Sequence, residues 1–157
     1  MNTIRPLLLL LLIALLGACT SAPESEPGLE VEIGEPRTTQ VHPAAGTSRP
    51  VLALLEQANH AARQGELAVA EARLERALRI EPRNAVLWYY LAKLRLHQGR
   101  LEEAAGLAAK SNSLDRRNNR ELQADNWRII AHARHRTGDE SGARDAEQRV
   151  RLLSNEH

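Results

Sequence analysis

Two histidines with a metal-binding spacing are the first residues whose types suggest chemistry. His132 and His135 lie one turn apart on an expected helix and could share a metal ion. No nearby cysteine or ordered carboxylate completes a convincing site, so two surface histidines on an arginine-rich helix are the favoured interpretation. No glycine-rich phosphate loop occurs, and Ser111 and Ser113 fall at the tail of a helix, outside any nucleophile motif. We therefore expect no enzymatic activity, no metal and no cofactor.

The one cysteine, Cys19, lies where lipid attachment would need a thiol. Residues 1–5 carry a single positive charge, residues 7–16 are all apolar, and Leu16-Gly17-Ala18 directly precedes the cysteine. An apolar run this short cannot span a bilayer permanently. The pattern resembles a lipobox, in which the cysteine thiol is alkylated by diacylglycerol before cleavage. We expect residues 1–18 to be a signal peptide and Cys19 to be lipidated; an ordinary signal peptide or a buried helix is the alternative.

The residue after the cysteine suggests which membrane holds the chain. Thr20 stands where an Asp would resemble an inner-membrane retention signal. Each buried methylene of an acyl chain contributes roughly 0.8 kcal/mol, and two or more chains make the attachment stable. We therefore expect a lipid anchor in a bacterial outer membrane, on its periplasmic face.

Charge and composition exclude several classes of protein. The chain of 157 residues has 21 basic and 20 acidic side chains, and Arg5 is the only charged residue before Cys19, so the mature chain is neutral. A nucleic-acid binder would usually carry a strong basic excess. A single cysteine allows neither an intramolecular disulfide framework nor a Cys/His zinc cluster. The absence of Phe and the 3% aromatic content favour an all-α domain over a β-sandwich.

Residues 19–48 have the composition of a flexible, disordered linker. Four prolines and three glycines lie between Thr20 and Thr47, with no sustained helical period. About 28 residues have a typical coil span of about 30 Å and a stretched limit of about 90 Å, so the segment would act as a tether. The stretch Leu29–Ile33 alternates apolar and acidic residues. We interpret it as a solvated part of the tether; the alternative is a strand that adds to the edge of a partner's sheet.

A repeat appears when the rest of the chain is superposed on the glycines at positions 65, 99 and 138. The residues eleven before, seven before and five after each glycine form three matching columns: Leu54, Trp88 and Trp127; Ala58, Ala92 and Ala131; Ala70, Ala104 and Ala143. A large apolar residue fills space between units, and an alanine lets the paired helix approach closely. The third unit is displaced by about five extra residues, which we place within Asn118–Gln123, lengthening its first helix.

These signals predict six helices in a domain over residues 49–157. Each glycine ends a helix in a left-handed conformation, Pro82 stops another helix, and Asn84 and Asp139 are placed to cap the helices that follow. The expected helices are 49–64, 67–80, 85–98, 101–113, 119–137 and 140–153. They form three antiparallel pairs, in repeats near 51–84, 85–118 and 119–153. The last helix has the amphipathic character of a solvating cap.

This pattern resembles the tetratricopeptide repeat family over about Val51 to Leu153. The resemblance implies an all-α helical-repeat solenoid of about three helix pairs. The family has a tyrosine at one position of the first helix of each pair. In this sequence that position is occupied by Ala61, Arg95 and Arg134 in the three units.

In the family, the first helix of each pair lines a concave face where partners usually bind. The positions of this sequence that would lie there, and that we expect to bind a partner, are Asn59, Arg63, Tyr89, Lys93, His97, Arg128 and His132. Tyr89 would be an aromatic anchor, and the cations would favour an acidic partner segment; a merely solvated face is the alternative. The carboxylate clamp of some family members is not matched, because Leu55, Tyr90, Asp125 and Ile129 depart from it.

The layout of lipobox, tether and short repeat domain resembles envelope-assembly lipoproteins. The run Leu54–Asn84 and the segment Asn126-Trp127-Arg128 resemble the LpoP-type activators of class A penicillin-binding proteins. That resemblance implies a monomer that docks on a peptidoglycan synthase and activates it. Two alternatives stay open: a passive adaptor in envelope, pilus or secretion-complex assembly, and a binder of an anionic envelope polymer.

Overall fold

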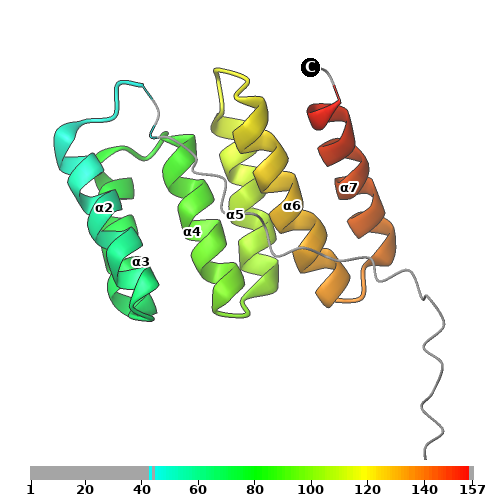
Figure 1. The fold of residues 1–157 in the computed structure, drawn as a ribbon, viewed down its shortest axis with the longest axis horizontal. Coiled ribbons are helices and arrows are strands. Elements are labelled where there is room, and N and C mark those ends of the chain that lie inside the picture. The colour runs from blue at the N-terminus through cyan, green and yellow to red at the C-terminus, as the bar shows by residue number, and fades with distance from the viewer. Residues whose placement is uncertain (1–42, 44, 156–157) are drawn as a thin grey trace, which may run out of the picture. The chain divides into compact units, whose positions relative to one another are not determined.

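The computed structural model describes Pro43 and residues 45–155, which form helices without any strand (Figure 1). The predicted signal peptide, Cys19 and nearly all of the tether lie outside these residues. Every predicted helix is present, with ends that differ by about one residue from those expected. The helices are α2 (Arg49–Arg63), α3 (Leu67–Ile80), α4 (Ala85–His97), α5 (Leu101–Leu114), α6 (Arg120–Arg136) and α7 (Glu140–Ser154). Within the described part of the chain, no helix is long and apolar enough to cross a bilayer.

Glycine ends the first helix of each pair, as predicted. Gly65, Gly99 and Gly138 have φ values of 78°, 73° and 83°, in the left-handed region that other residues adopt only at a cost. The chain then reverses, and α3, α5 and α7 run antiparallel to α2, α4 and α6 (Figure 1).

Asparagine and aspartate side chains begin several helices. The Asn84 side chain accepts a hydrogen bond from the backbone N–H of Val86, and that of Asp139 accepts one from Gly142, which confirms both predicted caps. Asn119 caps α6 in the same way, a role that sequence reasoning missed. The extra residues of the third unit lengthen its first helix, because α6 has 17 residues and α4 has 13.

Alanines form the contact surfaces between helices. Ala58, Ala92, Ala70, Ala104 and Ala143 are all nearly inaccessible to solvent, as close helix packing requires. The two tryptophans of the large apolar column, Trp88 and Trp127, are only partly buried, and they lie at the edges of the core. At those edges the Trp88 indole donates a hydrogen bond to the Pro82 carbonyl, and the Arg149 guanidinium lies over the ring of Trp127.

Two hydrophobic clusters run through the stack and meet at α4. One joins α2 and α3 to the side of α4 that carries Leu87, Leu91 and Leu94. The other joins the opposite side of α4 to α5, α6 and α7. The first helices α2, α4 and α6 therefore stand side by side, with α4 in the centre of the face that the sequence predicts to bind a partner (Figure 1).

Candidate functional site

A pocket of about 550 Å³ opens between the first repeat and α4. Its floor is apolar and comes from both helices of the first pair and from α4: Ala58, Ala62, Leu67, Ala70, Leu74 and Leu94. Its rim carries Asn59 and Arg63 from α2 and Lys93 and His97 from α4, together with Tyr90. Four of the seven predicted site residues therefore lie around one cavity, hereafter the groove.

The charge on the groove rim is positive. Arg63, Lys93 and His97 line the groove, and among the described residues no carboxylate does. Burial lowers the pKa of Lys93, while the charge of Asp125 acts in the opposite direction. Its ammonium lies 5.6 Å from the centre of the Tyr89 ring. A partly desolvated lysine at the rim of an apolar groove is well suited to an incoming acidic group.

Tyr89 is not the accessible anchor that the sequence suggested. Its side chain is only 2% exposed, and its hydroxyl donates a hydrogen bond to Asp125 Oδ2 on α6, over 3.2 Å. Burial and the neighbouring carboxylate both raise the pKa of this phenol. The expectation of an accessible ring was wrong because α6 packs against α4 and covers the position.

The next residue, Tyr90, provides the aromatic surface of the groove. Its ring meets that of Tyr89 edge to face, with centroids 5.2 Å apart. Burial raises the pKa of the Tyr90 hydroxyl, and Asn59, also on the groove, acts to lower that pKa. Sequence reasoning had treated Tyr90 only as a mismatch to the carboxylate clamp.

Arg128 lies outside the groove, and its charge is already paired. Its guanidinium contacts Asp125 Oδ1, so the buried carboxylate binds both Arg128 and Tyr89. Burial raises the pKa of Asp125, against the effects of Arg128 and Lys93. The charge of the predicted cation is therefore paired with a carboxylate that is 2% exposed.

The predicted His132 also lies outside the groove. Burial lowers its pKa, and the charges of Arg136 and His135 add to that effect. His135 faces Glu140, with 3.1 Å between Nδ1 and Oε1. Among the residues that the structure describes, no group of three or more His, Cys, Asp or Glu side chains could hold a metal ion.

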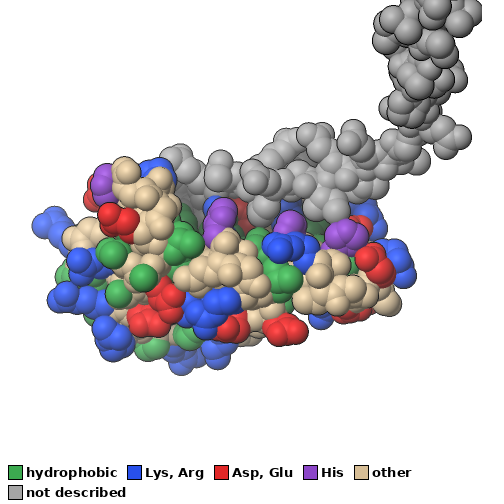
Figure 2. Space-filling view, turned by 90° about the horizontal axis from the view of Figure 1, so that it is seen from below, with side chains coloured by type: hydrophobic (Ala, Val, Ile, Leu, Met, Phe, Trp, Pro, Cys, Tyr) green, Lys and Arg blue, Asp and Glu red, His purple; other side chains and the backbone are tan. Residues whose placement is uncertain are grey.

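Basic residues and histidines also gather where α2, α4 and α6 end. Figure 2 looks at this edge of the domain and shows histidine and basic side chains spaced along it. The last turns contribute His60 and Arg63, Arg95 and His97, and Arg134, His135 and Arg136. Positive side chains are favourable there because carbonyl dipoles make the carboxyl end of a helix negative.

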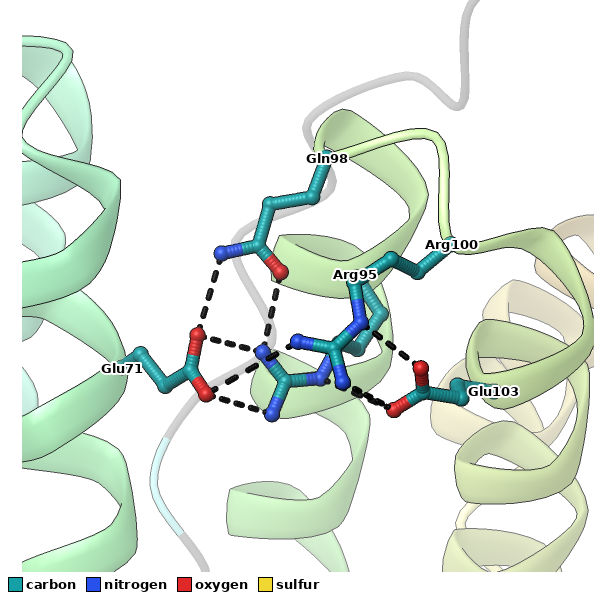
Figure 3. Close-up of polar contacts among 5 residues, drawn as sticks. All are labelled: Glu71, Arg95, Gln98, Arg100 and Glu103. Atoms are coloured by element: carbon teal, nitrogen blue, oxygen red, sulfur yellow. Dashed lines mark hydrogen bonds and ion pairs between the residues drawn. The ribbon is translucent and has the colours of Figure 1, made fainter.

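A polar cluster that sequence reasoning missed ties the first repeat to the second (Figure 3). The guanidinium of Arg95, which is 7% exposed, donates to Glu71 on α3 over 2.6 Å and to Gln98 over 2.9 Å, and also pairs with Glu103 on α5. The hydrogen bond from Arg95 is the largest reason why the pKa of Glu71 falls to about 2. The sequence did contain a signal for this cluster, because Arg95 is an arginine at the position where the family has a tyrosine.

The fold and the sequence both have relatives among known proteins. A family model described as tetratricopeptide repeat matches residues 61–124. The globular C-terminal domain of P. aeruginosa LpoP is 40% identical, with a TM-score of 0.63, and the match covers 66% of this chain and 97% of that domain. No curated protein matches the chain.

Other solved structures are similar in fold alone. The N-terminal domain of C. elegans stress-induced protein-1 has a TM-score of 0.63 at 18% identity, covering 68% of this chain and 85% of that one. The Sgt2 domain from Aspergillus fumigatus has a TM-score of 0.62 at 21% identity, covering 73% of each chain. Because the LpoP domain is matched over almost its whole length at 40% identity, the chain belongs to the tetratricopeptide repeat family as an LpoP-like protein.

Proposed function

We propose that the protein is an outer-membrane-anchored periplasmic lipoprotein that docks on a class A penicillin-binding protein and activates it. The observation that carries this proposal is the 40% identity to the LpoP domain over 97% of its length. The resemblance to LpoP-type activators then supplies the partner class. A tetratricopeptide domain is a protein-interaction module, and the groove between the first repeat and α4 would be the surface on which it docks.

The groove suits a partner segment that combines an apolar side chain with a carboxylate. The alanine and leucine floor would bury the apolar group, at about 25 cal/mol for each Å² removed from water. The carboxylate would pair with Lys93 and Arg63 on the rim. Activation would follow if the synthase conformation that presents this segment is also the more active one, because binding then shifts the population toward it.

The lipid anchor and the length of the segment that follows it are part of the same proposal. Lipid on Cys19 would hold the chain at the outer membrane, and Thr20–Thr47 would let the domain meet a synthase in the inner membrane. The sequence around Cys19 supports this arrangement, and so does the likeness to LpoP.

The test is a synthase assay with a soluble form of the chain. The mature sequence carrying Cys19→Ser would be added to a purified class A penicillin-binding protein of the same cell, with lipid-linked disaccharide-peptide as substrate. We expect faster glycan polymerisation or more cross-linking. An unchanged rate with every class A synthase of that cell would overturn the proposal.

The chain's two lysines provide a matched pair of variants for this assay. Lys93→Glu places a negative charge on the groove rim, and Lys110→Glu makes the same change on the exposed surface of α5. We expect Lys93→Glu to weaken binding by about tenfold or more and Lys110→Glu to leave it nearly unchanged. Equal behaviour of the two variants would place the docking surface elsewhere, and binding without a change in rate would indicate a passive adaptor.

A further inference from the structure

The outward side of α3 has an unusual combination of side chains. Exposed large hydrophobic residues are few among the described residues, and two of them, Val69 (42% exposed) and Ile80 (48% exposed), belong to α3. With 3.6 residues per turn, they share an arc of roughly 120° with Ala72 and three arginines. This α3 face consists of Val69, Ala72, Arg73, Arg76, Arg79 and Ile80.

The arginines of the α3 face have no partner among the described residues. Arg73, Arg76 and Arg79 form no ion pair with a described residue. Arginines elsewhere in the domain do form ion pairs, among them Arg95, Arg100, Arg128, Arg134 and Arg151. No carboxylate lies within the arc: Glu71 projects from another side of the helix, and Glu75, one turn before Arg79, lies about 40° beyond the edge of the arc. Within its own arc, the face is therefore a strip of positive charge about 16 Å long, with an apolar residue at each end.

The corresponding helices do not share this strip. On α5 the positions that match Val69, Arg73 and Arg79 are Glu103, Leu107 and Ser113, and only Arg76 has a basic counterpart, Lys110. On α7 acidic residues interrupt the exposed surface, and Arg151 lies within reach of Glu147. Figure 2 shows many Lys and Arg side chains at the end of the domain where α2 and α3 lie. The pattern thus belongs to one helix and is not a general property of the stack.

The chemistry of the α3 face favours a protein over a membrane. Interfacial helices usually insert Trp, Phe or Leu below many cations, and each cation near an anionic bilayer contributes only about 1 kcal/mol. The α3 face has three cations and no aromatic residue. Arginine between exposed aliphatic side chains is instead typical of protein interfaces, where its planar fork binds carboxylates in two-point contacts.

We propose that the α3 face is a second docking surface, which binds an acidic segment of a protein partner with aliphatic side chains placed to meet Val69 and Ile80. It lies on the side of α3 opposite Leu67, Ala70 and Leu74, which line the groove. The two surfaces can therefore be occupied at the same time. This goes beyond the proposed function, because it makes the domain a bridge between two partners.

The probe is a fluorescein-labelled synthetic helical peptide with Glu and Leu on one face, titrated at low salt with the mature chain carrying Cys19→Ser. All measurements are made on a Lys93→Glu background, so that the groove does not contribute. We expect Arg76→Glu on α3 to weaken binding by about tenfold, and Ile80→Ser to weaken it severalfold. Arg144→Glu, the same charge change on the exposed surface of α7, should have little effect.

Three results would overturn the proposal. The first is equal weakening by Arg76→Glu and Arg144→Glu, which would mean that only net charge matters. The second is no effect of Arg76→Glu at all. The third is binding to phosphatidylglycerol vesicles that depends on Arg76 while the peptide fails to bind, which would make the α3 face a membrane surface. None of these measurements involves a synthase, so their outcome does not depend on the result of the activation assay.

Discussion

Adjacent tyrosines on α4 have opposite environments. Tyr89 lies under α6 with its hydroxyl on Asp125, whereas Tyr90 is partly exposed and lines the groove. One step along a helix turns the side chain by about 100°, which is enough to move it from a solvent-facing position to an interhelical contact. The same rotation separates Lys93 on the groove rim from the fully buried Ala92.

Removing the buried hydroxyl tests the role of Tyr89. Tyr89→Phe would leave Asp125 with Arg128 alone, and an unsatisfied buried acceptor costs about 1–3 kcal/mol of unfolding free energy. We expect a loss in that range in urea unfolding. The control is Tyr90→Phe, which should cost about 0.5 kcal/mol or less because water can replace its partner. Equal losses would show that the Asp125 contact adds nothing.

The lowered pKa of Glu71 predicts how the fold responds to acid. A carboxyl whose pKa falls from 4.5 to about 2 on folding contributes stability above pH 4.5, and that stability disappears as the pH falls toward 2. Glu71→Gln should therefore lower the unfolding free energy by about 1–3 kcal/mol at pH 7, and the gap to the unsubstituted protein should narrow by pH 3.

Urea unfolding at pH 7, 4.5 and 3 measures that gap. Glu56→Gln, on the exposed side of α2, is the matched control and should change the unfolding free energy little at each pH. A gap for Glu71→Gln that stays constant from pH 7 to pH 3 would mean that ionisation of this carboxyl does not stabilise the fold.

At the scale of the helix, two glycines with helical backbone should respond oppositely to alanine. A Cβ on Gly106, within α5, would meet no atom within 4 Å. Gly106→Ala should raise the unfolding free energy by about 0.5–1 kcal/mol, because it restricts the unfolded chain. A Cβ on Gly142 would come within 2.1 Å of Asp139 Oδ2, the side chain that caps α7.

Gly142→Ala should therefore displace the cap and lower the unfolding free energy by about 1 kcal/mol. Thermal and urea unfolding of the two variants, compared with the parent chain, measure both changes. A stabilising effect of Gly142→Ala would show that Asp139 keeps its hydrogen bond, or that the bond contributes little.

The helices could be predicted from the sequence because their ends depend on local signals. Gly65, Gly99 and Asn84 act within a few residues of their own positions, so spacing alone placed the helix boundaries. The site depends on contacts between repeats. Tyr89 was misplaced because only the structure shows that α6 covers it, and Arg128 was taken for a free cation because its partner Asp125 is buried by that same packing.

At the scale of the whole molecule, the groove depends on how two repeats are joined. One wall comes from α2 and α3, and the other comes from α4. The contact between Arg95 and Glu71 bridges α3 and α4, and Arg95 also reaches Glu103 on α5 (Figure 3). A directional polar contact of this kind sets the angle between repeats more narrowly than aliphatic packing alone. The arginine at the position of the family's tyrosine thus joins the two helices that carry opposite walls of the groove.

The length of the segment before the domain allows a test of the proposed reach from the outer membrane. The 28 residues from Thr20 to Thr47 can span at most about 90 Å. Deleting residues 21–40 would leave eight of them, with a limit below about 30 Å. If the protein reaches an inner-membrane synthase from the outer membrane, this shortened chain should stimulate the purified synthase normally and fail in cells.

The expected failure in cells is measured by fluorescent labelling of the wall. Cells that depend on this protein are given a fluorescent D-amino acid, and its incorporation into the wall is recorded. A chain with residues 21–40 replaced by Gly and Ser at equal length is the matched control, and it should restore incorporation because reach, and not sequence, is what the deletion removes. Full incorporation with the shortened chain would contradict an outer-membrane anchor, since a domain held within about 30 Å of that membrane could not meet a synthase across the periplasm. Failure of both chains would instead indicate that residues 21–40 contain a specific contact, for which the alternating stretch Leu29–Ile33 is the first candidate.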